Sequence, residues 1–308
     1  MTVNPQPWLH RFACFLASAT FLLLVAGASV TSHRAGLSVP DWPTTYGQFM
    51  FSFPASKWVG NIFYEHGHRL IASVVGMLTV VLALWLVRVE PRRWVRRLGI
   101  TAVAAVIAQG ILGGLTVKLM LPPVVSIAHA CLAEAFFCVT VALALVTSET
   151  WRQPTHPPGG SDVRLAQRLA LASTIAVYVQ IILGAAIRHR EWGVFAHMLG
   201  AVAVFGCVMS TLCVVLFTAK PPGFLRLAVV LQGMVTVQIT LGLITLMVHV
   251  PKNAVDQLST VQVLVPTVHL ALGALVLATS LVMTLRTFRF LAATGEEPSL
   301  PLAQGVLS

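Results

Sequence analysis

Charged residues are scarce in this sequence. Lys, Arg, Asp and Glu together make up 10% of its 308 residues, whereas 57% are hydrophobic and the mean hydropathy is +0.85. A soluble globular domain contains about 25% charged residues. The shortage of charge therefore excludes an ordinary soluble domain and indicates a membrane protein with several spanning segments.

Cysteine is missing from the polar connections between the apolar segments. Because the cysteines lie inside the apolar runs, we expect no disulfide framework in the outer loops. The five residues are Cys14, Cys131, Cys138, Cys207 and Cys213.

A cleavable signal peptide is also not expected. The first apolar run is long enough to span a membrane and has no clear small-residue cleavage site after it.

Eight apolar segments are long enough to cross a hydrocarbon core, which takes about 20 residues of helix. Their length favours helices over the strands of a β-barrel, because barrel strands alternate over about 10 residues. The sequence thus predicts an all-α, polytopic membrane protein with eight transmembrane helices. The expected spans lie near residues 12–31, 66–88, 96–118, 124–147, 165–187, 194–217, 224–248 and 263–286.

Basic residues gather in alternate connections between these spans. Thirteen of the 20 Lys and Arg residues lie before the first span or after the even-numbered spans, and residues 88–97 alone hold five arginines. The positive-inside rule makes this side cytoplasmic, so both termini are expected inside. The net charge of +10 lies in these short loops, which indicates topology signalling and argues against a nucleic acid-binding face.

A Pro- and Gly-rich stretch separates two halves of four spans each. We expect an N-terminal half over 1–150, a cytoplasmic linker over 151–163 and a C-terminal half over 164–308. The halves share a weak internal repeat, in which Gln109–Thr116 aligns without gaps to Gln238–Thr245 at an offset of 129. Because each half has an even number of spans, the repeat is parallel and predicts two four-helix bundles of the same orientation.

Four histidines occupy equivalent places in this repeat. His68 aligns with His197 at the offset of 129, and His129 aligns with His269 at an offset of 140. Each lies near the start of a span that runs from outside to inside, so the four imidazoles are expected at one depth near the outer leaflet. A lone histidine there would bond to a backbone carbonyl or a headgroup, but four repeat-related ones favour ligands.

Two imidazoles at one depth on facing helices can bind one metal between them. Haem iron takes two axial ligands on opposite faces of the porphyrin, and bundle cores commonly hold such cofactors. Zinc fits less well, since it takes three or four ligands and each half offers two clear ones. We predict that His68 pairs with His129 and His197 with His269. His66 is two residues from His68, but on a helix it would point to another face.

Here the sequence resembles a known family. Residues 65–69, Glu-His-Gly-His-Arg, match the Glu-x-x-His-Arg signature of haem A synthases, and residues 34–43, Arg-Ala-Gly-Leu-Ser-Val-Pro-Asp-Trp-Pro, are similar to that family's first-loop motif. The resemblance covers nearly the whole chain. One departure is that residues 32–65 and 188–193 lack the cysteines that many members carry there, which removes any thiol-assisted role.

The resemblance implies a function and its cofactors. The family oxidises the C8 methyl group of haem O to the formyl group of haem A, which is inserted into haem-copper terminal oxidases. It implies haem O as substrate in the N-terminal half and a haem b in the C-terminal half, in a bacterial cytoplasmic membrane. Haem O synthase, terminal oxidase assembly proteins and membrane lipid are the implied partners, and nucleic acid is not among them.

The two halves differ at the positions that flank the first histidine. In the C-terminal half, Val194 and Met198 stand where the N-terminal half has an acid and an arginine. The first outer loop of the N-terminal half is also the longer one. Glu65 lies three residues before His68, on nearly the same helix face. A carboxylate there could stabilise positive charge on the substrate methyl carbon or accept a proton from water, so we predict a catalytic role. The alternative is a salt bridge to Arg69.

Other polar residues have two interpretations each. Arg34 and Arg69 are candidates to meet haem propionates, since arginine makes bidentate contacts with carboxylates, with headgroup contact as the alternative. Residues 41–43, Asp-Trp-Pro, would form a lid element over the first site. Alternatively, their tryptophan would be an anchor at the membrane interface. Glu134 lies inside a span but five residues from His129, so we expect a structural hydrogen bond.

Two other classes of function compete with the synthase. A membrane b-type cytochrome that only moves electrons explains the four histidines equally well. It does not explain why one half alone carries Glu65 and a long outer loop. A transporter would place polar groups in broken helices at mid-membrane depth, whereas here they cluster near the outer face.

Overall fold

The computed structural model describes residues 6–152, 163–189, 193–217, 223–248 and 258–290. Over these residues the chain is almost entirely helical, with no β-strand. Eight helices are long and apolar enough to cross a membrane, which confirms the all-α, eight-span prediction. They are α1 (Pro7–Ser32), α2 (Asn61–Val89), α3 (Arg93–Lys118), α4 (Pro123–Thr147), α6 (Val163–His189), α7 (Val194–Phe217), α8 (Phe224–Met247) and α9 (Thr260–Phe290).

The short elements were not predicted. They are the one-turn helix α5 (Glu149–Arg152) and two 3-10 turns, η1 (Met50–Ser52) and η2 (Ala55–Lys57). The expected linker at 151–163 lies outside the described residues except for its first two and its last residue.

Proline lies at the start of two long helices and in the interior of a third. Pro7 and Pro123 lie in the first turns of α1 and α4, where the missing N–H breaks no helical hydrogen bond. Pro266 lies inside α9, three residues before His269. Such interior prolines are tolerated in spanning helices because neighbouring helices and hydroxyl side chains can satisfy the freed backbone groups.

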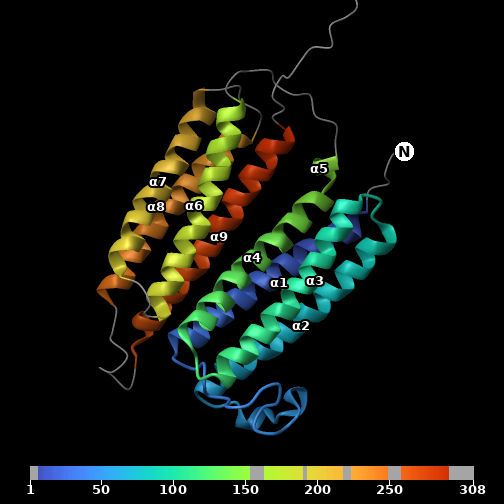
Figure 1. Cartoon of the computed structure of the whole chain (residues 1–308), viewed down its shortest axis with the longest axis vertical. Helices are drawn as coiled ribbons and strands as arrows, with labels where there is room; N and C mark the ends of the chain where they lie inside the picture. The colour runs from blue at the N-terminus through green and yellow to red at the C-terminus, as the bar shows by residue number, and fades with distance from the viewer. Residues whose placement is uncertain (1–5, 153–162, 190–192, 218–222, 249–257, 291–308) are drawn as a thin grey trace, which may run out of the picture.

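The eight long helices form two groups of four that lie side by side (Figure 1). In the first group α1 and α3 each contact both α2 and α4. In the second group α6 and α8 each contact both α7 and α9. The groups meet where α9 packs against α1 and α4, and where α4 packs against α6.

Each group has its own apolar core, and a smaller cluster joins them. Leu16 and Leu82 are among the buried side chains of the first core. Leu24 of α1, Phe137 of α4 and Ala274 of α9 pack together between the two groups. Without water to expel inside a bilayer, such contacts stabilise mainly through close packing.

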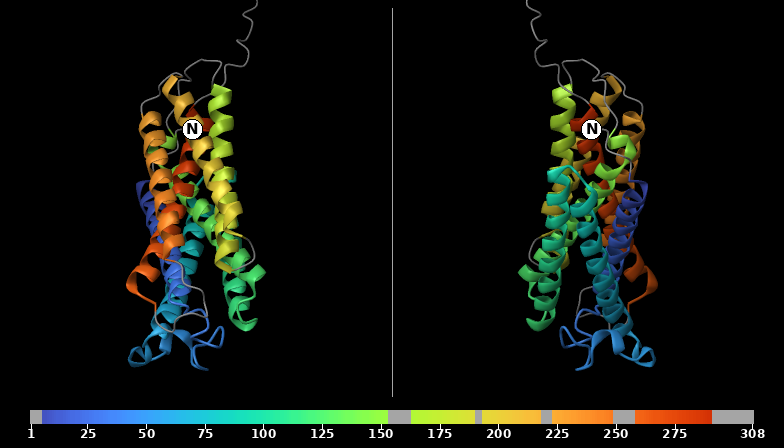
Figure 2. Two further views of the ribbon diagram at one scale, coloured as in Figure 1. Left: turned by 90° about the vertical axis from the view of Figure 1, so that its left-hand side faces the viewer. Right: turned by 90° about the vertical axis from the view of Figure 1, so that its right-hand side faces the viewer.

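The two ends of the first group differ. The N-terminus of α1 and the short α5 lie at one end, and the connection between α1 and α2, residues 33–60, lies at the other (Figure 1). Figure 2 shows from two sides that this connection projects beyond the helix ends. The N-terminal group therefore carries a substantial cover at the end where His68 lies on α2.

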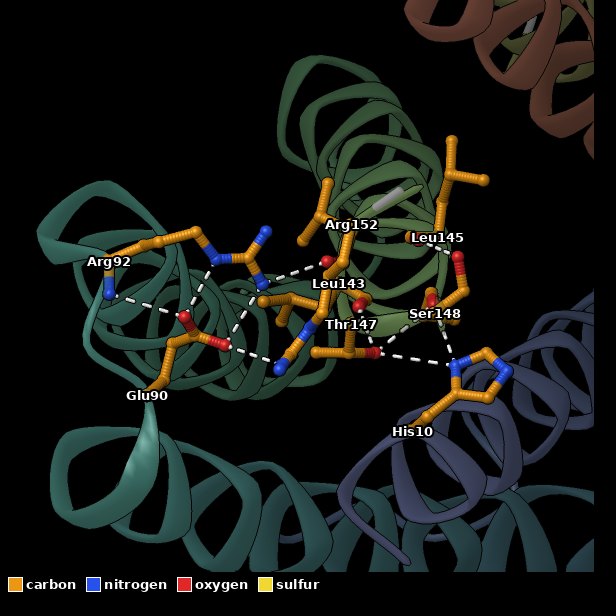
Figure 3. A network of polar contacts seen from close by, with 10 residues as sticks. His10, Glu90, Arg92, Leu143, Leu145, Thr147, Ser148 and Arg152 are labelled. Atoms are coloured by element: carbon orange, nitrogen blue, oxygen red, sulfur yellow. Dashed lines mark hydrogen bonds and ion pairs between the residues drawn. The ribbon is translucent and has the colours of Figure 1, made fainter. Parts of the chain in front are cut away.

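A polar network ties the helices together at the opposite end (Figure 3). The fully buried carboxylate of Glu90 accepts hydrogen bonds from Arg92 at 2.7 and 2.9 Å and from Arg152 at 2.9 Å. Arg92 also donates to the carbonyl of Val146 at 2.9 Å. From α1, Nδ1 of His10 lies 3.0 Å from a backbone carbonyl of α4. His10 thus has the ordinary structural role of a histidine at a helix end.

Candidate functional site

Each of the four aligned histidines lies against a glycine on the long helix that precedes it in the chain. A Cβ atom at any of these glycines would lie 3.0 or 3.1 Å from Cε1 of the imidazole. That spacing is tighter than ordinary van der Waals contact, so a larger residue would displace the ring. The pairs are Gly27 with His68, Gly113 with His129, Gly184 with His197 and Gly242 with His269.

The same four imidazoles share an unsatisfied atom. Nδ1 of each is buried and has no hydrogen-bond partner in the described structure. Buried polar groups normally have partners, so four equivalent exceptions indicate a function other than structural hydrogen bonding. The ordinary alternative is found elsewhere: Nδ1 of His33 lies 2.9 Å from the carbonyl of Ser29.

The C-terminal pair has the spacing of two axial ligands. The ring centroids of His197 and His269 are 6.5 Å apart, with an angle of 77° between the ring planes. A metal about 2 Å from each ligating nitrogen would set two ring centres roughly 6 Å apart. Among the described residues no group of three or more His, Cys, Asp or Glu side chains gathers around one point. The donor set fits a group that brings its own equatorial ligands, as a porphyrin does.

The N-terminal pair is also brought together. His129 lies near enough to His68 to interact with it electrostatically, and Arg69 acts on the same ring. His66 points elsewhere, as predicted. It is fully buried between the rings of Phe53 and Trp58, at centroid distances of 5.1 and 4.8 Å.

Three of the four histidines are also bonded through their backbone to a glutamine. Nε2 of each glutamine donates to the carbonyl oxygen of the histidine on the next long helix, at 2.8 or 2.9 Å. Each glutamine lies four residues, about one helical turn, before the glycine that faces the ring. The pairs are Gln109 with His129, Gln180 with His197 and Gln238 with His269. The residue four positions before Gly27 is Leu23.

Glu65 and Arg69 form a buried ion pair, with Nη2 and Oε1 2.6 Å apart and side chains 5% and 9% exposed. The other carboxylate oxygen of Glu65 accepts the backbone N–H of Val39 at 2.8 Å. Arg69 donates to the carbonyls of Val39 at 2.9 Å, Asp41 at 2.7 Å and Thr44 at 3.2 Å. The salt bridge that the spacing allowed is therefore present within α2, and the hydrogen bonds of its two side chains attach the 33–60 connection to this helix.

The connection is also ordered from within. Asp41 accepts hydrogen bonds from the hydroxyl of Thr44 and from the N–H groups of Tyr46 and Gly47. Burial alone would raise the pKa of the Asp41 carboxyl, but these hydrogen bonds outweigh it and lower the pKa below its ordinary value. A carboxylate that stays ionised at neutral pH thus organises this turn.

The ring of Trp42 lies against α3 beside the first site. A Cβ atom at Gly114 would lie 2.6 Å from this ring, so only glycine leaves room for it. The preceding residue, Gly113, is the one that faces His129. Trp42 therefore joins the 33–60 connection to the helix whose preceding glycine faces His129. Whether residues 41–43 act as a lid stays a prediction.

Comparison with known proteins identifies the family. Residues 10–196 match the family model described as cytochrome oxidase assembly protein. This chain belongs to the cytochrome oxidase assembly protein family. Together with the eight apolar helices, this makes it an integral membrane protein.

Several relatives of this chain are named Heme A synthase. The protein from Symbiobacterium thermophilum is 31% identical over 188 residues, which cover 58% of this chain and 58% of the relative. The one from Shouchella clausii is 28% identical over 186 residues, or 59% of this chain and 60% of the relative. The one from Rhizobium etli is 24% identical over 314 residues, or 79% and 83%. The chain thus spans about three fifths of the length of the first two.

The matched region of this family member ends at residue 196. It includes the Glu65–Arg69 pair, the 33–60 connection and the first two histidines, and it stops one residue before His197. The geometry of the C-terminal site therefore rests on the structure and on the internal repeat.

Two further predicted polar residues, Arg34 and Glu134, differ in burial. Arg34 is exposed just after α1, with its backbone in the left-handed region at φ 57°. Glu134 is 4% exposed on α4, and its Oε2 has no partner among the described residues. The structural hydrogen bond expected for Glu134 is not found at this oxygen among the described residues, and the role of Glu134 stays a prediction.

The glutamine contacts are a feature that the sequence alone does not reveal. Gln109 and Gln238 mark the internal repeat, and Gln180 lies outside that alignment. The signal that identifies all three is Gln-x-x-x-Gly on the helix before each histidine. The fourth helix has the glycine without the glutamine, which hides the pattern.

Proposed function

We propose that this chain is a haem A synthase, which oxidises the C8 methyl group of haem O to the formyl group of haem A for terminal oxidase assembly. The observation that carries the proposal is the set of four glycine-faced imidazoles, each with a buried Nδ1 that lacks a partner in the described structure. The name Heme A synthase, which its relatives carry, supports the same activity.

The two histidine pairs have different tasks in this proposal. His68 and His129 hold haem O, and His197 and His269 hold a resident haem b. When bound, the two iron porphyrins supply the oxidation and electron-transfer chemistry. The protein provides the ligands, the orientation and the surrounding charges, and the glycines leave space for the rings.

Glu65 is the proposed catalytic carboxylate. It lies about one helical turn before His68, and Arg69 and the N–H of Val39 fix both of its oxygens. A carboxylate fixed in this way can stabilise positive charge at the methyl carbon or accept a proton from water. The C-terminal group has Val194 and not an acid at the aligned position, which suits a site for electron transfer.

Arg34 and Arg69 are the proposed propionate-binding cations. Arginine pairs well with carboxylates, and both residues lie at the end of the N-terminal group that carries the 33–60 connection. For Arg69 this task would be additional to its contacts with loop carbonyls and Glu65.

The proposed location is a bacterial cytoplasmic membrane with both termini in the cytoplasm. The positive-inside rule supports this orientation, because the basic connections lie at the α5 end. Both haem sites then lie near the outer face. Haem O synthase as supplier and terminal oxidase assembly proteins as recipients are the proposed partners.

Replacement of Glu65 tests the proposal. The Glu65→Gln variant removes the negative charge and keeps the side-chain shape, so we expect it to retain bound haem but to stop haem A formation. Haem content is measured by absorbance of the purified protein, and haem A by extraction from membranes. Glu90→Gln, at the far end of the first group, is the control and is expected to make haem A. A normal haem A yield from Glu65→Gln would rule out the catalytic role.

A further inference from the structure

The glutamine contacts divide the four histidines three to one. Gln109, Gln180 and Gln238 each donate to a histidine carbonyl across a helix pair. At the fourth place, on α1, the residue is Leu23, whose apolar side chain packs against the first core. The exception falls on His68, the histidine beside Glu65.

We propose that His68 is the exchangeable axial ligand of this protein and that the three glutamines are positioning residues that fix the other three ligands. The inference rests on the proposed function, because it assumes that the histidine pairs bind haem. It adds which of the four iron–imidazole bonds opens most readily.

The glutamine contact fixes a ligand through its backbone. The carbonyl of a helical residue is already bonded within its own helix, so the amide of Gln180 adds a second contact from the neighbouring helix to His197. In a membrane interior no water competes for that carbonyl. Such a contact resists sliding of the two helices past each other, and with it any movement of the imidazole.

Glycines on the histidine helix bring the glutamines close. A Cβ atom at Gly200 would collide with Oε1 of Gln180, and one at Gly273 would lie 3.2 Å from Nε2 of Gln238. Both glycines lie about one turn after the histidine of the same helix. Gln180 and Gln238 therefore pack closely against the histidine helix, where a larger residue would displace them.

The second end of each glutamine amide is not used in any contact within the described part of the protein. Oε1 of all three is buried and has no partner in the described structure, and Nδ1 of each facing histidine is in the same condition. In the C-terminal group Nε2 of Gln238 also lies 3.5 Å from Nε2 of His269. Each glutamine thus lies beside the histidine that it holds through the backbone.

The helix that carries His68 is held at its outer end and not beside His68 itself. Its helix, α2, is fastened at its outer end by Glu65 and Arg69, which bond to the 33–60 connection. Between α1 and α2 the ring meets Gly27, and Leu23 offers no donor to its carbonyl. A change in the connection can therefore move His68 along α1 without breaking a contact of the glutamine type.

This asymmetry fits the different needs of the two haems. A substrate haem has to enter and its product has to leave, so at least one of its axial bonds must break readily. A resident haem has no such need, and both of its proposed ligands, His197 and His269, carry the glutamine contact. His129 would remain as the fixed ligand on the substrate side.

Carbon monoxide is the probe for this inference, because it binds ferrous haem when an axial ligand leaves. In the reduced, purified full chain we expect carbon monoxide to bind one of the two haems, the one held by His68 and His129. Leu23→Gln supplies the missing donor and should slow this binding by about fivefold, in line with the strength of interhelical hydrogen bonds in membranes. Leu23→Met, with similar volume and no amide, is the control and should bind at the wild-type rate.

The reverse substitution checks the same idea. Gln180→Met removes the contact to His197 and should make the C-terminal haem reactive to carbon monoxide, by optical difference spectra, while the bis-histidine spectrum before carbon monoxide remains. If Leu23→Gln and Leu23→Met bind at equal rates, or if Gln180→Met leaves that haem unreactive, the inference is wrong and the proposed function still stands. If the wild-type protein carries no haem with two histidine ligands, the proposed function itself fails.

Discussion

At the scale of single residues, the site depends on the absence of side chains as much as on their presence. Four glycines leave room for four imidazoles. Because Ala is a better helix former than Gly, replacing one of them should favour the helix itself. Any loss of haem binding in such a variant must then come from displacement of the imidazole ring.

Gly242→Ala is the direct test of this space. The added Cβ would lie 3.1 Å from Cε1 of His269, so we expect a weaker axial bond and reduced b-type absorbance per protein. Gly233→Ala in the same helix is the matched control, because nothing lies within 4 Å of its Cβ position, and it should keep the full spectrum. Equal spectra for the two variants would contradict a ligand role for this glycine–histidine contact.

The sequence predicted some of these residues and missed others for a physical reason. The four histidines could be found because their place at the start of a span repeats. Glu65 and Arg69 could be paired from their i, i+4 spacing. The glutamine contacts could not be foreseen, because the donor and the accepting carbonyl lie on different helices. The unsatisfied Oε2 of Glu134 likewise depends on which helices surround it.

At the scale of helices and connections, buried charges decide how the ends of the first group are joined. At the outer end Arg69 donates hydrogen bonds to three carbonyls of the 33–60 connection. At the other end Glu90 forms ion pairs with two arginines. The helix bounds were predictable to within a few residues, since apolar run length fixes them. The fold of the 33–60 connection was not, because it depends on contacts with α2 and α3.

The Glu90 network predicts a pH dependence of stability. Burial alone would raise the pKa of Glu90, but hydrogen bonds and charges from Arg92 and Arg152 outweigh it and lower the pKa below the ordinary 4.5. A lowered pKa in the folded state means that the network stabilises fully above that ordinary value. The stabilisation is lost as the pH falls through the lower pKa of the folded protein.

Glu90→Gln should therefore lower the free energy of unfolding by about 3 kcal/mol at neutral pH, since it leaves two arginines without their anion. The difference from the wild type should persist down to the ordinary pKa and shrink below it. Thermal unfolding in detergent across this pH range measures it. Glu149→Gln, an exposed acid of α5, is the control. A difference that grows as the pH falls would contradict the account.

At the scale of the whole molecule, two groups of four helices meet through packed side chains and a few polar contacts. Nη2 of Arg188 on α6 donates to Oγ of Ser32 on α1 at 2.8 Å, and the hydroxyl of Thr267 on α9 lies 2.8 Å from the same oxygen. These contacts connect the C-terminal group with α1 a few residues after Gly27. The eight spans could be predicted from the sequence. This junction could not, since its residues are far apart in the chain.

The central claim is that one half of the molecule binds a substrate haem and the other a resident haem. Mass analysis of the haems bound to the purified full-length protein tests it most directly, using cells that make haem O and have no other source of haem A. The account predicts haem b together with haem O or haem A in the wild type, and no haem A in Glu65→Gln. Haem b alone, at two per chain, would contradict the account and indicate a b-type cytochrome.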